Sequence, residues 1–243
     1  MIYRLEEVLK ALLAAGLTLN LQKCRFGMRI IEYLGFQIGR GHIWPGERKI
    51  SAIADMPRPT NQTEVRRFLG LVSFFRRFVP NFAVITSPIS RLLRNDVQFQ
   101  WEVIQDEAFE DIKKKLSCGP ALKAYNATAA NTELHTDACS KGIAGMLLQS
   151  DREGDPLALV YAVSRTTSQV EEKYHSSRLE LMAISWSTQR LRPFLIGIPF
   201  TIVTDCQCLI NINTWKTQSS QIARWACELS EFDFTIKHRP GKQ

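Results

Sequence analysis

The second half of the chain contains short, largely apolar stretches separated by turns and loops, and Thr132–Asp137 alternates between polar and apolar residues. This pattern predicts five strands, at Thr132–Asp137, Ile143–Leu148, Leu157–Val163, Pro199–Asp205 and Phe232–His238. A helix is expected from Ser177 to Arg192, between the third and fourth strands, and another is expected to begin over Gln207–Ile212. This order of elements predicts an α/β fold, a mixed five-stranded sheet with flanking helices.

The first half has helical spacing instead. Apolar positions predict a helix over residues 3–15 and a second helix that carries an apolar stripe from Val65 to Val79. Asn61-Gln62-Thr63-Glu64 has the pattern of a capping box, and Pro80 and Pro88 are expected to interrupt the chain after this second helix. A further helix is expected at Asp106–Leu116. Short strands are expected at Thr18–Asn20 and Ile30–Ile38.

Composition excludes several classes of protein. No apolar run reaches the roughly 18 residues that a membrane span needs, and the N-terminus lacks a secretory pattern. The six cysteines are scattered, which argues against a zinc ribbon or a disulfide framework. We therefore expect an intracellular protein, cytoplasmic or nuclear, with no membrane partner.

Positive charge is concentrated in the first half of the chain. The net charge is +7, and residues 58–94 hold seven arginines against one acid, Glu64. Arg66, Arg67, Arg76 and Arg77 lie largely off the apolar stripe, so the predicted helix has a basic flank. Such a flank suits nucleic-acid phosphates, although an ordinary solvated face is equally consistent with the charge.

Three acids occupy positions where catalytic sites often form. Asp137 and Asp205 each end a predicted strand, and Glu180 lies near the start of the long helix. If they converge, within about 4–7 Å of one another, they form most of a two-metal site that cleaves nucleic acid. Singly, each has a simpler reading: Asp137 as a turn former, Glu180 as a capping-box residue and Asp205 as a helix cap.

The motifs around these acids resemble a known family. Leu134-His135-Thr136-Asp137, Glu180-Leu181-Met182-Ala183-Ile184 and Phe200-Thr201-Ile202-Val203-Thr204-Asp205 resemble the ribonuclease H domain of gypsy-like LTR retrotransposon Pol polyproteins. Upstream motifs resemble the end of the reverse transcriptase palm and its thumb; they are Leu17–Asn20, Tyr33–Phe36, Phe68–Leu71 and Arg76–Phe82. The resemblance implies a palm end at 1–45, a mainly helical thumb and connection at 46–120, and a ribonuclease H-like domain at 121–243.

The resemblance also implies roles for particular residues. Asp137, Glu180 and Asp205 match the family's catalytic Mg²⁺ ligands, two ions per site, with Mn²⁺ as an alternative metal. Gln207 matches a residue that contacts the RNA/DNA hybrid. Tyr33, Leu34, Gly35 and Phe36 match the hairpin that positions a primer end. Gly70 matches the thumb helix that tracks a duplex, with a packing glycine as the alternative reading. The implied partners are an RNA/DNA hybrid, a primer-template duplex and the rest of the Pol polyprotein.

Two departures from the family pattern qualify these roles. No Asp-Asp dipeptide is present, so the polymerase aspartates are absent, and the family's fourth acid is expected beyond Gln243. The leading hypothesis is a ribonuclease H-type endonuclease that does not polymerise DNA on its own. The alternatives are an inactive or co-opted nucleic-acid-binding remnant and, less well supported by the order of the acids, an integrase-like enzyme.

Overall fold

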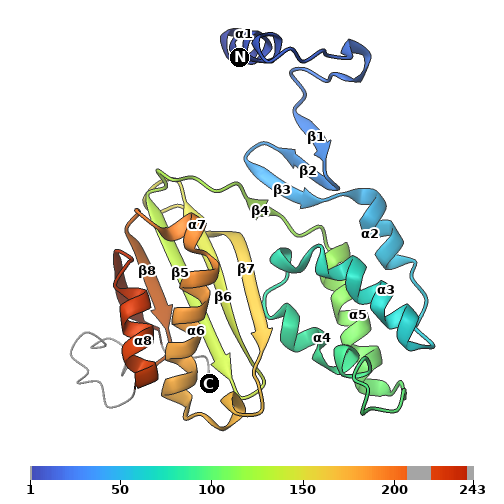
Figure 1. The fold of residues 1–243 in the computed structure, drawn as a ribbon, viewed down its shortest axis with the longest axis vertical. Helices are drawn as coiled ribbons and strands as arrows, with labels where there is room; N and C mark the ends of the chain where they lie inside the picture. Colours follow the sequence, from blue (N-terminus) through green and yellow to red (C-terminus); the bar gives the residue numbers. More distant parts are fainter. Residues whose placement is uncertain (1, 207–219, 240–243) are drawn as a thin grey trace.

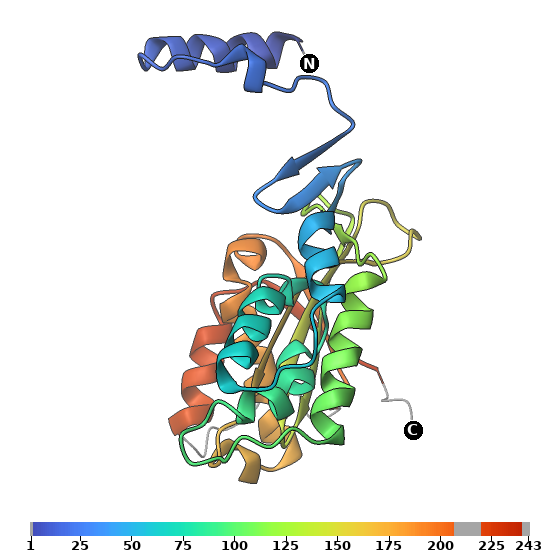
Figure 2. The same ribbon diagram turned by 90° about the vertical axis from the view of Figure 1, so that its right-hand side faces the viewer.

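The structure, a computed structural model, describes residues 2–206 and 220–239. It contains two sheets and two hydrophobic cores, one in each half of the chain. Figures 1 and 2 show that the N-terminal helix α1 (Ile2–Ala14) extends away from both, and none of its residues is buried. Among the described residues, no helix is long and apolar enough to span a membrane.

The second half forms the mixed five-stranded sheet that the pattern predicts. The strands are β5 (Asn131–Cys139), β6 (Gly142–Ser150), β7 (Ala158–Thr166), β8 (Phe200–Thr204) and β9 (Phe234–His238). Their order in the sheet is β7-β6-β5-β8-β9. The first three pair antiparallel, whereas β8 runs parallel to β5 and β9 parallel to β8. The predicted α/β class and strand count are therefore confirmed.

Helices cover one face of this sheet (Figure 1). The long helix α6 (Ser176–Arg190) packs on β5 and β6 and also contacts α8 (Ser220–Leu229), while η3 (Glu171–Lys173) precedes it and the short α7 (Arg192–Leu195) comes after it. Because α6 lies between the sheet and α8, most of its residues are buried, including polar Ser187 and Thr188. The helix expected over Gln207–Ile212 lies outside the described residues.

The first half contains a small antiparallel sheet that the pattern did not predict in full. Its strands are β1 (Ile30–Tyr33), β2 (Phe36–Gly39), β3 (His42–Pro45) and β4 (Leu122–Lys123). The single strand expected at Ile30–Ile38 is wrong, because the chain reverses at Leu34-Gly35, where both residues have positive φ. The strand expected at Thr18–Asn20 is also absent, and a turn of 3₁₀-helix, η1 (Leu21–Lys23), comes directly after that segment. Because β4 pairs with β3, residues 122–123 belong to the first sheet.

Four helices supply most of the hydrophobic core of the first half of the chain. They are α2 (Glu47–Ala54), α3 (Gln62–Ser73), α4 (Phe82–Arg91) and α5 (Val103–Ser117). The Asn61 side chain caps α3, but Glu64 accepts from the Thr60 amide at 2.7 Å, so the cap reaches one residue further back than the capping box predicted. Pro88 lies inside α4 and does not end it.

The apolar stripe expected to continue to Val79 does not lie on one helix. Helix α3 ends at Ser73, and a 3₁₀ turn, η2 (Arg76–Phe78), redirects the chain toward the five-stranded sheet. There Ser164 on β7 joins the two halves: its carbonyl accepts from Arg76 Nη2 at 2.7 Å, and its hydroxyl accepts from the Ala83 amide at 3.0 Å. Helix α4 packs on β7 beside this junction.

Candidate active site

Asp137 and Asp205 leave the five-stranded sheet at the same edge. Asp137 lies near the C-terminal end of β5, and Asp205 is the residue directly after β8. These strands are parallel neighbours, with His135 opposite Val203, so each aspartate is two residues beyond that pair. Both aspartates are exposed. The parallel pairing thus produces the convergence at a strand end that the sequence predicts.

Glu180 approaches this edge from helix α6 and is buried, with 5% of its surface exposed. Its Oε1 accepts a hydrogen bond from the Ala138 amide at 3.1 Å, whereas its Oε2 is buried and has no hydrogen-bond partner within residues 2–206 and 220–239. The capping-box reading of Glu180 is wrong, because His175 is the N-cap of α6 and its side chain accepts from the Ser177 amide. A buried carboxylate oxygen without a partner is costly and calls for an explanation.

The three acids share one electrostatic environment. Burial, followed by the negative charges of Asp205 and Asp137, raises the pKa of Glu180 to about 8. The hydrogen bond from the Ala138 amide acts in the opposite direction and lowers the pKa. Near neutral pH, the metal-free site therefore favours a protonated Glu180. A bound cation would favour the ionised form instead.

The donor set suits a hard divalent cation, since carboxylate oxygens are the ligands that Mg²⁺ and Mn²⁺ take in proteins. The unpartnered Oε2 of Glu180 is an available ligand atom beside two exposed aspartates. Across residues 2–206 and 220–239, however, no three His, Cys, Asp or Glu side chains are already gathered as a metal site. The acids are thus neighbours rather than a preformed cage. Gln207, the predicted hybrid contact, lies outside the described residues.

The hairpin predicted to position a primer end is present in the small sheet. Tyr33 pairs with Phe36 across a two-residue turn in which Leu34 has φ 49° and Gly35 has φ 79°, as a type I′ turn requires. Leu34 is 72% exposed, and its left-handed backbone conformation is unfavourable for leucine. Phe36 anchors the hairpin by stacking on Phe74, with ring centroids 4.7 Å apart. The turn therefore presents an exposed, strained tip on a fixed base.

The four arginines predicted to share one basic flank do not do so. Arg66 and Arg67 are exposed on α3. Arg76 donates to the Ser164 carbonyl, and Arg77 lies over the rings of Phe36 and Tyr161, 4.2 and 5.9 Å from their centroids. Burial lowers the pKa of Arg77. Because α3 ends before them, Arg76 and Arg77 are at the junction between the two halves of the chain.

Gly70 has no packing role within the described chain. It is exposed in the middle of α3, and a Cβ added there would meet nothing within 4 Å. The packing-glycine reading is therefore wrong. Glycine costs about 1 kcal/mol relative to alanine inside a helix, and no neighbour in the structure accounts for that cost.

Sequence reasoning missed one contributor to the site and could not predict the location of two arginines near it. The Ala138 amide holds Glu180, and no sequence pattern indicates such a backbone donor. Arg91 and Arg94 were counted in the basic segment, but their position opposite the β5–β6 turn depends on the tertiary fold.

Comparison with known proteins places this arrangement in a family. Residues 128–232 match the model of the RNase H-like domain found in reverse transcriptase. The transposon Tf2-3 and Tf2-4 polyproteins of Schizosaccharomyces pombe are each 31% identical to the chain over 240 residues, which cover 97% of this chain and 18% of each polyprotein. The chain thus spans about a fifth of the length of these relatives.

Solved structures share the fold over nearly the whole chain. The foamy viral protease-reverse transcriptase dRH in complex with double-stranded DNA gives a TM-score of 0.80 at 20% identity, over 98% of this chain and 43% of that one. The foamy viral protease-reverse transcriptase in complex with an RNA/DNA hybrid gives 0.79 at 21% identity, over 100% of this chain and 33% of that one. Residues 128–232 thus carry the RNase H-like domain found in reverse transcriptase, and the chain as a whole corresponds to a segment of LTR retrotransposon Pol polyproteins.

Proposed function

We propose that this chain hydrolyses the RNA strand of RNA/DNA hybrids at Asp137, Glu180 and Asp205, which would hold two Mg²⁺ ions, with Mn²⁺ as an alternative. The observation that carries the proposal is Glu180. Its carboxylate is buried beside two aspartates, one of its oxygens has no hydrogen-bond partner in the described part of the chain, and its pKa is raised to about 8. None of the ion pairs among the described residues involves Glu180, and a divalent cation would offset the repulsion among the three carboxylates when they are ionised.

The three acids would have different roles, because Glu180 is buried whereas Asp137 and Asp205 are exposed. Glu180 is held by the Ala138 amide, so its free Oε2 stays available as a ligand in a fixed position. Asp137 and Asp205 are exposed at the ends of paired strands, so both would be accessible to a nucleic-acid strand. When bound, the cations supply activation of a water nucleophile and stabilisation of the leaving oxygen.

Duplex binding would use the first half of the chain. The exposed turn of the hairpin at Tyr33–Phe36 and the face of α3 that carries Arg66, Arg67 and Gly70 are accessible to a primer-template duplex. The arginines supply phosphate contacts, and Gly70 leaves room for a sugar-phosphate backbone close to the helix. The rest of the Pol polyprotein is the expected covalent partner of the exposed N-terminal segment.

The proposal is tested with hybrids labelled on either the RNA or the DNA strand. The chain should cut the RNA strand only, and cutting should stop with EDTA and with Asp137→Asn or Asp205→Asn. Asp155→Asn is a matched control, because Asp155 is an exposed acid in the loop before β7. Cleavage that persists in EDTA, or in both site variants, would refute the assignment. Tight hybrid binding without any cleavage would favour the nucleic-acid-binding remnant.

A further inference from the structure

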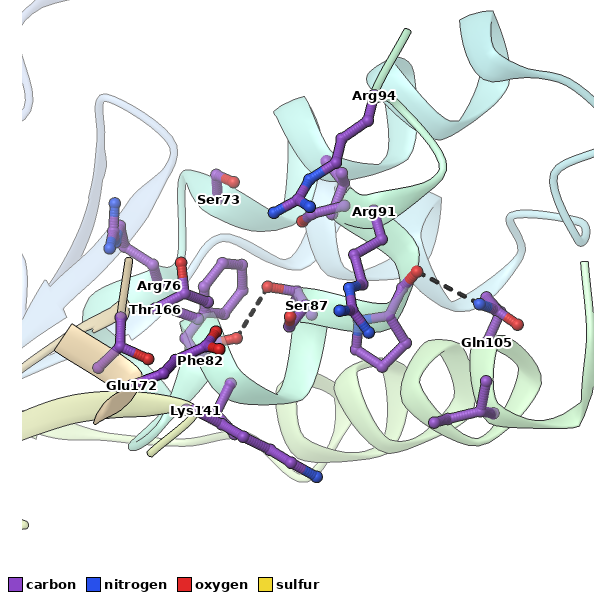
Figure 3. Close-up of a pocket in the computed structure, with 18 of the residues that line it drawn as sticks. Ser73, Arg76, Phe82, Ser87, Arg91, Arg94, Gln105, Lys141, Thr166 and Glu172 are labelled. Atoms are coloured by element: carbon purple, nitrogen blue, oxygen red, sulfur yellow. Dashed lines mark hydrogen bonds between the residues drawn. The ribbon is translucent and has the colours of Figure 1, made fainter. Parts of the chain in front are cut away.

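A groove of about 720 Å³ lies between the helices of the first half and the five-stranded sheet (Figure 3). Helices α3 and α4 form one wall, and the β5–β6 turn, the end of β7 and η3 form the other. The groove combines residues that are far apart in sequence. Neither half of the chain forms it alone.

Positive charge gathers around this groove. Arg76, Arg91 and Arg94 line it from the helical side and Lys141 from the β5–β6 turn, whereas Glu172 is the one acid among the described residues that line it. Arg91, Arg94 and Lys141 are exposed, and none of the ion pairs found among the described residues involves them. Cations around a concave surface reinforce one another's potential, which favours a polyanionic ligand.

Hydroxyl groups accompany these cations. The groove is also lined by Ser73, Ser87, Ser90, Ser140 and Thr166. Serine and threonine hydroxyls donate to phosphate oxygens, and arginine pairs with phosphate through two parallel hydrogen bonds. A mixture of guanidinium, ammonium and hydroxyl donors suits a phosphodiester chain better than an apolar or a neutral ligand.

The groove adjoins the candidate active site along the chain. Ser140 and Lys141 come three and four residues after Asp137, so the backbone of Ser140 lies within roughly 10 Å of Asp137. The turn is also fixed in place: the Thr167 hydroxyl donates to the Ser140 carbonyl, and the Thr167 amide donates to the Lys141 carbonyl. A strand bound in the groove therefore has a defined position relative to the acids.

We propose that this groove binds the phosphates of one strand of the nucleic-acid substrate, with Arg91, Arg94 and Lys141 as its contacts. The inference rests on the proposed nucleic-acid function and assigns the path by which a strand reaches the acids. Arg76 is left out of this set because its guanidinium already donates to Ser164. The two walls come from different halves of the chain, so bound phosphates bridge the halves.

The test compares two triple variants with the same change in charge. One is Arg91→Gln, Arg94→Gln and Lys141→Gln; the control is Lys114→Gln, Arg152→Gln and Arg190→Gln, three exposed cations that do not line the groove. Both carry Asp137→Asn so that the RNA/DNA hybrid stays intact during binding measurements. The groove variant should bind the hybrid about tenfold or more weakly than the control. The slope of log affinity against log salt should fall by about 3, one for each phosphate contact.

A change of opposite sign provides a second test. Glu172→Lys removes the one acid of the groove and should strengthen hybrid binding severalfold. Equal affinities and salt slopes for the two triple variants, or unchanged binding by Glu172→Lys, would overturn the inference. It would also be overturned if the groove variant lost polyglutamate binding as strongly as hybrid binding, because that result would indicate an acidic polypeptide as the ligand. Cleavage is measured separately with Asp137 intact, so a chain that binds through the groove but does not cut refutes only the proposed hydrolysis.

Discussion

Replacing Glu180 with glutamine removes an ionisable group but keeps its size and an oxygen that can accept from the Ala138 amide. In the metal-free protein the folded-state pKa of Glu180 is about 8, whereas its ordinary value is 4.5. Between these pH values the folded state holds a proton that the unfolded chain has lost. The free energy of unfolding therefore contains a favourable contribution below pH 4.5 that is lost as pH rises through about 8.

The shift in pKa sets the size of this loss. Each pH unit between the two pKa values costs about 1.4 kcal/mol, so wild type loses up to about 3 kcal/mol by pH 7 and up to about 5 kcal/mol above pH 8. The Glu180→Gln variant loses none of it. We expect the variant to gain stability relative to wild type by these amounts as pH rises, in urea unfolding measured with EDTA present.

Divalent cations should reverse the order. A cation at a hundred times its Kd stabilises the folded wild type by about 3 kcal/mol, and Glu180→Gln should gain much less because a ligand is lost. If the difference in unfolding free energy between wild type and variant is the same at pH 5 and pH 8, burial and the two neighbouring aspartates do not raise the pKa of Glu180. If Mn²⁺ stabilises both proteins equally, Glu180 is not a ligand.

Three further predictions concern the scaffold. Gly70→Ala should stabilise the chain by about 1 kcal/mol in urea unfolding but weaken duplex binding, because it favours the helix and fills the space left for a ligand; unchanged duplex binding would contradict the second part. Arg165 pairs with Glu171 through two hydrogen bonds and lowers the pKa of Glu171 to about 2. Because solvent screens this partly exposed pair, Glu171→Gln should remove about 1 kcal/mol of stability above pH 4.5, and wild type should lose the same amount as pH falls toward 2. Identical acid unfolding of wild type and variant would refute this. Gly142→Ala should lower the free energy of unfolding by about 1–3 kcal/mol, because the new Cβ would lie 2.6 Å from Val84 Cγ2 and 2.8 Å from the Arg165 carbonyl oxygen. An unchanged thermal unfolding temperature would show that α4 does not pack this closely on β6.

The five-stranded half could be predicted because its local pattern and its tertiary environment agree. β5 alternates with period two, and β6 and β7 are short apolar runs bounded by turns. Helical segments come before β8 and before β9, so the order of elements indicates the parallel pairing that brings Asp137 and Asp205 together. What the sequence could not indicate is the backbone amide of Ala138 on Glu180, which depends on how α6 lies against β5.

The first half was predicted less well because tertiary contacts override its local pattern. The turn at Leu34-Gly35 was read as strand, since leucine is uncommon at positive φ and gives no turn signal. Phe75, Phe78 and Val79 are buried, as the apolar stripe predicts, but they lie beyond the end of α3. The chain changes direction at η2, so these residues are not on the same helix as the rest of the stripe. Arg77 therefore lies over aromatic rings instead of on a basic surface.

The central claim is that Asp137, Glu180 and Asp205 cleave RNA, and the most direct measurement is single-turnover cleavage of an RNA/DNA hybrid at saturating protein. Wild type and Asp155→Asn should cut the RNA strand at equal rates, faster with Mn²⁺ than with Mg²⁺, while Asp137→Asn should bind the hybrid as tightly and not cut it. Equal rates for Asp137→Asn and wild type, or no cutting by wild type in either metal, would contradict the account.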